Sequence, residues 1–176
     1  MGRARDIASL LTTSSVLATD AEVASLGYLT SASASTTYAT KTDFPADAWI
    51  SWTPTYTNLI VGNGTISARY KQIGKNVFIK HSFSFGSTSS ISGNVTLTLP
   101  ITAKSESLYS STMANLVDAD GSYSIGHVWH NGQTTMQVWG AQPSGSRIAW
   151  TGLSSTFPHT WATSDSINFV YTYEAE

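Results

Sequence analysis

From residue 49 onward the chain alternates between apolar and polar positions with the period of a β-strand. The alternation is regular over residues 77–85, 95–99 and 167–173, where aliphatic or aromatic residues occupy every second position. It continues over residues 123–130 and 136–139. Such a pattern predicts half-buried antiparallel strands, with one row of side chains in a core and the other row facing solvent.

Turn-forming residues separate these segments. They are Gly62–Gly64, Gly74–Asn76, Ser92–Asn94, Asp120–Gly121, Asn131–Gly132 and Ser144–Gly145. Asn-Gly, Asp-Gly and other glycine-containing pairs readily adopt the backbone angles of tight hairpin turns. About eight short strands joined in this way predict a mainly β fold, an antiparallel β-sandwich of the jelly-roll type.

Residues 1–48 differ in composition from residues 49–176. They contain three of the chain's aromatic residues and none of its six Trp residues. This change predicts a domain boundary near residue 48. The C-terminal domain is long enough to bury a core of its own. The N-terminal segment is too short and too polar to do so, and we expect it to be ordered by sister chains or by a larger assembly.

The N-terminal segment carries two short helix signals. Asp6 can cap a first helix, and Thr19–Glu22 fits the capping box of a second. Helices this short are marginal alone in water, so their apolar residues need a partner. The candidate docking residues are Ile7, Leu10, Leu11, Val23 and Leu26. Residues 30–43 are nearly all Ser, Thr and Ala and read as a linker.

Composition and charge exclude several classes of protein. Charged residues make up 11% of the chain, and the formal net charge is −2. Scattered Lys and Arg give no electrostatic footprint for nucleic acid. The absence of Cys excludes a disulfide framework, a thiolate metal site and a cysteine nucleophile. No run of about 18 apolar residues occurs, so insertion into a membrane as a helix is not expected.

The sequence favours a binding or structural protein over an enzyme. It contains no Gly-x-Ser-x-Gly elbow, its acidic residues are scattered, and we expect no cofactor. Asp118–Gly121 is a fragment of a calcium-binding loop, but the complete loop needs further ligands. Because Asp-Gly is foremost a hairpin signal, a turn is expected there, with a metal site as the alternative.

Tryptophan and histidine residues are the best candidates for functional contacts. The candidates for contact with a receptor or a neighbouring subunit are Trp139, Trp161, His159 and His130. Trp139 alternates with Met136 and Val138 and is therefore expected on the outward face. Trp161 lies in a predicted loop, and His130 adjoins a turn and is expected to be exposed. Exposed Trp rings either pack against a neighbouring subunit or stack on sugars.

The remaining aromatic candidates are expected to be structural. Trp129 and Trp150 alternate with apolar neighbours and are predicted to lie in the core. His81 and His127 stand in similar apolar rows and are predicted to be core or interface residues. On a regular strand His127 and His130 face opposite sides, so they cannot bind one metal ion together.

Three segments resemble bacteriophage tail-fibre and minor tail proteins. Gly64–Ile79 looks like the hairpin that opens their terminal β domain, and Asp165–Ala175 is similar to their closing strand. Residues 35–42, Ser-Thr-Thr-Tyr-Ala-Thr-Lys-Thr, resemble the linkers that join fibre stalks to their heads. The resemblance implies a homotrimeric appendage of the virion, assembled in the host cytoplasm. Its residues 1–48 would contact other virion structural proteins, and its β head a host surface glycan or protein.

Two other interpretations stay open. The chain would be a head fibre or capsid decoration protein if its role were only structural. It would be a free carbohydrate-binding module if it acted alone.

Overall fold

The alternating segments form antiparallel strands in this computed structural model, which describes residues 48–105, 111–130 and 132–176. The strands are β1 (Ile50–Ser51), β2 (Tyr56–Ile60), β3 (Thr65–Ile73), β4 (Asn76–Ser84), β5 (Ser90–Thr98), β6 (Ser111–Val117), β7 (Tyr123–His130), β8 (Thr135–Ser144), β9 (Arg147–Gly152) and β10 (Ser166–Glu174). The prediction of a mainly β, antiparallel fold is confirmed. The two predicted helices and the five docking residues lie outside the described residues.

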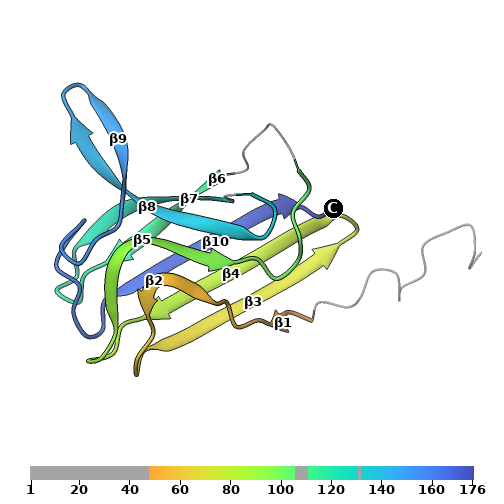
Figure 1. Cartoon of the computed structure of the whole chain (residues 1–176), viewed down its shortest axis with the longest axis horizontal. Coiled ribbons are helices and arrows are strands. Elements are labelled where there is room, and N and C mark those ends of the chain that lie inside the picture. The colour runs from red at the N-terminus through yellow and green to blue at the C-terminus, as the bar shows by residue number, and fades with distance from the viewer. Residues whose placement is uncertain (1–47, 106–110, 131) are drawn as a thin grey trace, which may run out of the picture. The chain divides into compact units, whose positions relative to one another are not determined.

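The ten strands belong to one curled sheet of half-barrel shape (Figure 1). Its strand order is β1-β3-β4-β10-β6-β7-β8-β5-β2, and β9 pairs with β8 outside this path. Strand β8 has two partners on one edge, because residues 135–138 pair with β5 and residues 139–144 pair with β9. The β8–β9 hairpin projects from the rest of the sheet (Figure 1). In the described residues, no helix has the length and apolar character needed to cross a membrane.

The inward face of the curl is filled by large side chains from β4 and β10 and small ones from β7. Phe83 of β4 and Tyr171 of β10 are buried, and the buried residues of β7 include the smaller Gly126 and Val128. A Cβ atom at Gly126 would lie 3.0 Å from the Trp139 carbonyl oxygen and 3.1 Å from the Ala114 Cβ. The core therefore has little room for a larger side chain at this position.

The packing of β7 reverses the face that the sequence predicts to point inward. Gly126, Val128 and His130 are the buried residues of this strand, so the intervening side chain of Trp129 faces outward. Trp150 of β9 is half-buried and stands outside the core cluster. The prediction that Trp129 and Trp150 belong to the core is therefore wrong. Both faces of β7 carry apolar residues. The face that packs into the core is the one with the smaller residues, Gly126 and Val128.

A hydrogen bond joins the two sides of the curl across the core. Tyr56 Oη of β2 lies 2.7 Å from His81 Nε2 of β4. The His81 ring is 5% exposed and stacks on Phe169 with 4.5 Å between ring centroids, which confirms its predicted place in the core. Burial lowers the pKa of His81 to about 4, so its imidazole is neutral at pH 7.

Acid should destabilise the fold through His81. The pKa of His81 is about 4 in the folded protein and about 6.5 in the unfolded chain. As the pH falls below 6.5 the unfolded chain binds the proton first, and stability drops until about pH 4, by about 3 kcal/mol in total. The double variant His81→Phe/Tyr56→Phe lacks this group and should lose less stability over the same window. Urea unfolding at several pH values measures the difference.

The matched control is the single variant Tyr56→Phe, which retains the buried imidazole. Its stability should keep the steeper fall between pH 6.5 and 4. If the double variant and the single variant show parallel pH profiles, His81 is not the group responsible.

Candidate functional site

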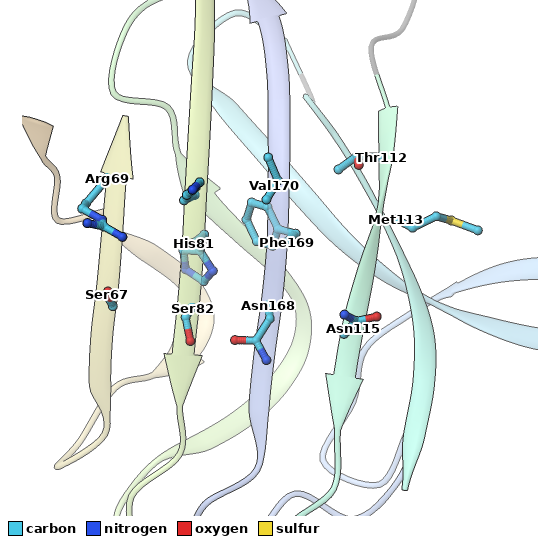
Figure 2. A pocket seen from close by; sticks show the side chains of 11 residues that line it. Ser67, Arg69, His81, Ser82, Thr112, Met113, Asn115, Asn168, Phe169 and Val170 are labelled. Carbon is cyan, nitrogen blue, oxygen red and sulfur yellow. The ribbon is translucent and has the colours of Figure 1, made fainter. Parts of the chain in front are cut away.

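The outward face of β3, β4, β10 and β6 contains a hollow of about 530 Å³ (Figure 2). We call it the polar hollow; it is lined by Ser67, Arg69, Lys80, His81, Ser82, Thr112, Met113, Asn115, Asn168, Phe169 and Val170. The strand registers pair Ser67 with Ser82, Ser82 with Asn168, and Asn168 with Asn115. Figure 2 shows these four side chains in one row across the four strands. The row therefore presents hydroxyl and amide groups to solvent side by side.

The polar groups of this row are largely unused inside the chain. The side chains of Ser67, Ser82 and Asn115 make no hydrogen bond with any residue that the structure describes. Asn168 Nδ2 donates to Ser166 Oγ at 2.8 Å, which leaves the amide oxygen of Asn168 as an acceptor. The hollow thus offers both donors and acceptors to a bound molecule.

Two cations stand next to this row. Arg69 of β3 and Lys80 of β4 are directly opposite each other in the antiparallel register. Like charges in this position are destabilising, by a few tenths of a kcal/mol to about 1 kcal/mol. Lys80 Nζ lies 4.9 Å from the centroid of the Trp49 ring, a cation–π contact that holds the ammonium group. Among the described residues, Arg69 makes no ion pair.

An apolar surface borders the polar hollow on β6, β7, β8 and β9. We call it the aromatic patch; it consists of Met113, Ile125, His127, Trp129, Trp139 and Trp150. The ring centroids of Trp129 and Trp139 are 5.0 Å apart, and His127 stacks on Trp150 at 4.7 Å. Burial lowers the pKa of His127, so its ring is neutral at pH 7.

The hollow and the patch meet along the β6–β7 pair. Met113 and Asn115 of β6 are the direct cross-strand neighbours of His127 and Ile125 of β7. Met113 is 57% exposed and Ile125 is 52% exposed. Large apolar side chains gathered on one outward face are typical of a surface that binds another molecule.

Of the four predicted contact residues, Trp139 lies in this region. Its side chain is on the outward face, opposite the buried Met136 and Val138, as the alternation predicts. Its Nε1 donates to Gln137 Oε1 at 3.1 Å, so the indole is held in place. The contact it would make with a receptor or subunit stays a prediction.

His130 is not exposed, and the prediction that it is exposed is wrong. The residue is 8% exposed, and its Nδ1 lies 2.8 Å from Tyr171 Oη. Its backbone N–H donates to the same oxygen at 3.1 Å. The reversed faces of β7 explain the error, because they turn His130 inward and Trp129 outward.

Trp161 and His159 order the loop before β10 and lie outside both the hollow and the patch. The Trp161 ring stacks on Phe85 at 4.8 Å, and its Nε1 donates to the Ser154 carbonyl oxygen at 3.0 Å. The ring centroids of His159 and Trp161 are 4.3 Å apart. His159 Nε2 lies 3.6 Å from the buried Asp165 Oδ2. These contacts account for both side chains within the fold.

The segment Asp118–Gly121 forms the predicted turn. The Gly121 N–H donates to the Asp118 carbonyl oxygen at 3.0 Å, and Gly121 has a φ of 93°. Asp120 Oδ1 accepts from the Ser122 N–H at 2.7 Å, which lowers the pKa of Asp120. Across the described residues, no cluster of three or more His, Asp or Glu side chains could hold a metal ion.

Sequence reasoning missed the polar hollow, although one part of it could have been found. A hairpin turn at Gly74–Lys75 pairs Ile73 with Asn76, and this register places Arg69 opposite Lys80. The contributions of Asn115 and Asn168 could not be found in the same way. They depend on β10 inserting between β4 and β6, which are not its neighbours in sequence.

Comparison of the chain with protein-family models, with curated proteins and with solved structures gives no match.

The buried carboxylate of Asp165 should contribute strongly to stability. Asp165 Oδ1 accepts from the Ala119 N–H at 2.9 Å, and Oδ2 accepts from the Ala162 N–H at 2.6 Å. Replacement by Ala leaves both N–H groups without their acceptor, so Asp165→Ala should lower the free energy of unfolding by about 2 to 4 kcal/mol. Urea unfolding measures this loss. The control Asp120→Ala removes an exposed acceptor in the adjoining turn and should cost about 1 kcal/mol or less. Equal losses in the two variants would contradict this account.

Proposed function

We propose that the chain is an appendage protein of a bacteriophage virion, and that a trimeric, jelly-roll-like β head attaches the particle to the host surface. The observation that carries the proposal is the outward sheet face on which the polar hollow adjoins the aromatic patch. One face thus supplies both a surface for subunit packing and a recess for recognition. The resemblance of residues 35–42, 64–79 and 165–175 to tail-fibre and minor tail proteins supports the same function.

In this proposal the aromatic patch is the contact between subunits. Ile125 and Met113 are aliphatic side chains with more than half of their surface exposed. Burying them against a second copy of the chain gains about 25 cal/mol for each Å² of apolar surface. A sugar face gains chiefly from aromatic rings, so the aliphatic members favour a protein partner. Closed cyclic symmetry would give each subunit the same environment.

The N-terminal residues complete the proposed assembly. We assign Ile7, Leu10, Leu11, Val23 and Leu26 to helices that dock on other virion structural proteins. Three copies of one recognition site on the trimer would then act together, and avidity would raise the attachment strength of a weak site.

A second candidate is the free carbohydrate-binding module. It is favoured by the adjacent Trp129 and Trp139 rings, whose outward position is also suited to stacking on saccharides. In that case the aromatic patch would be open to ligand in a monomer. The state of the chain in solution separates the two candidates.

The full chain should form trimers through the aromatic patch. Native mass spectrometry is expected to show a species of about 56 kDa, three chains of 18.8 kDa each. The variant Ile125→Glu places a charge in the patch and should dissociate the trimer or weaken it at least tenfold, because the carboxylate would be buried without a partner.

The matched control for this experiment is Ile60→Glu. Ile60 is 61% exposed on β2, outside the patch, and its replacement should leave the trimer intact. A stable monomer of the full chain would overturn the trimer and favour the free module. A trimer that Ile125→Glu leaves unchanged would contradict the assignment of the patch.

Attachment is tested on the particles themselves. An antibody against residues 49–176 should label virions and reduce their adsorption to host cells, and the purified full chain should compete with virions for the same cells. Fab fragments, which are monovalent, control for aggregation of the particles. Labelling without any effect on adsorption would indicate a head fibre or capsid decoration protein instead.

A further inference from the structure

We infer that the polar hollow binds an anionic saccharide, one whose sugar hydroxyls lie on the row of Ser and Asn side chains and whose carboxylate or phosphate contacts Arg69. This inference rests on the proposed function, because it names the class of ligand through which the β head would attach.

The charge of the hollow indicates an anionic ligand. Arg69 and Lys80 face outward as a directly opposed like-charge pair. Among the described residues, the four strands of the hollow carry one carboxylate, that of Glu174. Glu174 pairs with Asn76, four residues along β4 from Lys80, which is about 13 Å at the rise of a strand. Its carboxylate is also held by Lys104 Nζ at 3.1 Å. Within the part of the chain that the structure describes, an arriving anion would therefore find the two cations without a competing acid beside them.

The chemistry of the two cations suits a carboxylate or a phosphate. The guanidinium group of Arg69 presents a planar fork of donors that matches the paired oxygens of either anion. The ammonium group of Lys80 acts as a point charge, and the Trp49 ring limits where it can move. Because both groups are exposed, their attraction to the ligand should be weakened by salt.

The rest of the hollow suits a sugar better than a bare ion. Ser67, Ser82 and Asn115 supply polar groups that no other described residue uses. Such groups can pair with several hydroxyls of one sugar at once. A small inorganic anion is too small to contact all of them. Val170 adds apolar surface against which the C–H face of a sugar ring can lie. A volume of about 530 Å³ falls within the range of small-molecule sites, about 300 to 1,000 Å³.

The position of the hollow next to the aromatic patch offers another occupant. In a trimer, an acidic segment of a neighbouring subunit could reach Arg69 across the patch. The saccharide is favoured because the donor and acceptor row extends over four strands, far beyond what one carboxylate side chain would contact. The protein occupant is distinguished from the saccharide by the test below.

The test is calorimetric titration of the full chain with three probes. The probes are a tetrasaccharide containing glucuronate, a tetrasaccharide carrying a phosphate group, and neutral maltotetraose. We expect at least one charged probe to bind tenfold or more tightly than maltotetraose, and more weakly at 300 mM than at 50 mM NaCl. The two charged probes show whether the hollow prefers a carboxylate or a phosphate.

Two matched variants locate the site. Arg69→Gln should weaken binding of the charged probe at least tenfold without lowering the melting temperature, since it removes one member of the like-charge pair with Lys80. Arg147→Gln removes another exposed arginine, at the start of β9 outside the hollow, and should leave binding unchanged. Equal effects of the two variants, or no binding of either charged probe, would overturn the inference. So would an Arg69→Gln variant that binds the probes normally but loses its trimer, since that result assigns the hollow to a neighbouring subunit.

Competition with virions for host cells separates this inference from the proposed function. If the wild-type chain and Arg69→Gln compete equally well, attachment stands and the hollow is not its site. If the wild-type chain binds a charged probe but does not compete with virions, the saccharide site stands and the attachment function fails.

Discussion

The packing of one sheet around its own aromatic core is the constraint on which the rest of the structure depends. The curl turns one row of each strand inward, where Phe83 and Tyr171 fill the interior and the Tyr56–His81 hydrogen bond ties β2 to β4. Side chains of the other row remain on the outward face. The polar hollow and the aromatic patch both lie there. The recognition that we propose would therefore take place on the surface of the domain.

The same constraint explains how much of the fold could be predicted. Segments such as 77–85 and 167–173 alternate between large apolar and mostly polar residues, so their inward row was clear from the sequence. Strand β7 is different, because apolar residues stand in both of its rows. Periodicity predicts a strand there but does not select the buried row. The selection is made by Gly126, which lies against Ala114 and the Trp139 backbone in the folded sheet.

The candidate site shows a second limit of sequence reasoning. The outward position of Trp139 follows from its alternation with Met136 and Val138, which lie on the same strand. The polar hollow combines residues from β3, β4, β6 and β10, and their proximity depends on strand order. An asparagine such as Asn115 carries no mark in the sequence that it lies beside Asn168. The non-local pairing of β10 with β6 alone brings the two together.

The small number of charged residues in the chain affects the electrostatic potential at the polar hollow. In a protein with many ionisable groups, nearby acidic side chains would offset the positive potential of Arg69 and Lys80. Here charged residues make up 11% of the chain, and the described lining of the hollow contains no carboxylate. Because nearby charges dominate the local potential within about one Debye length, these two cations make the described lining of the hollow positive. A surface poor in charge also limits non-specific adhesion, so selectivity can rest on a few groups at one place.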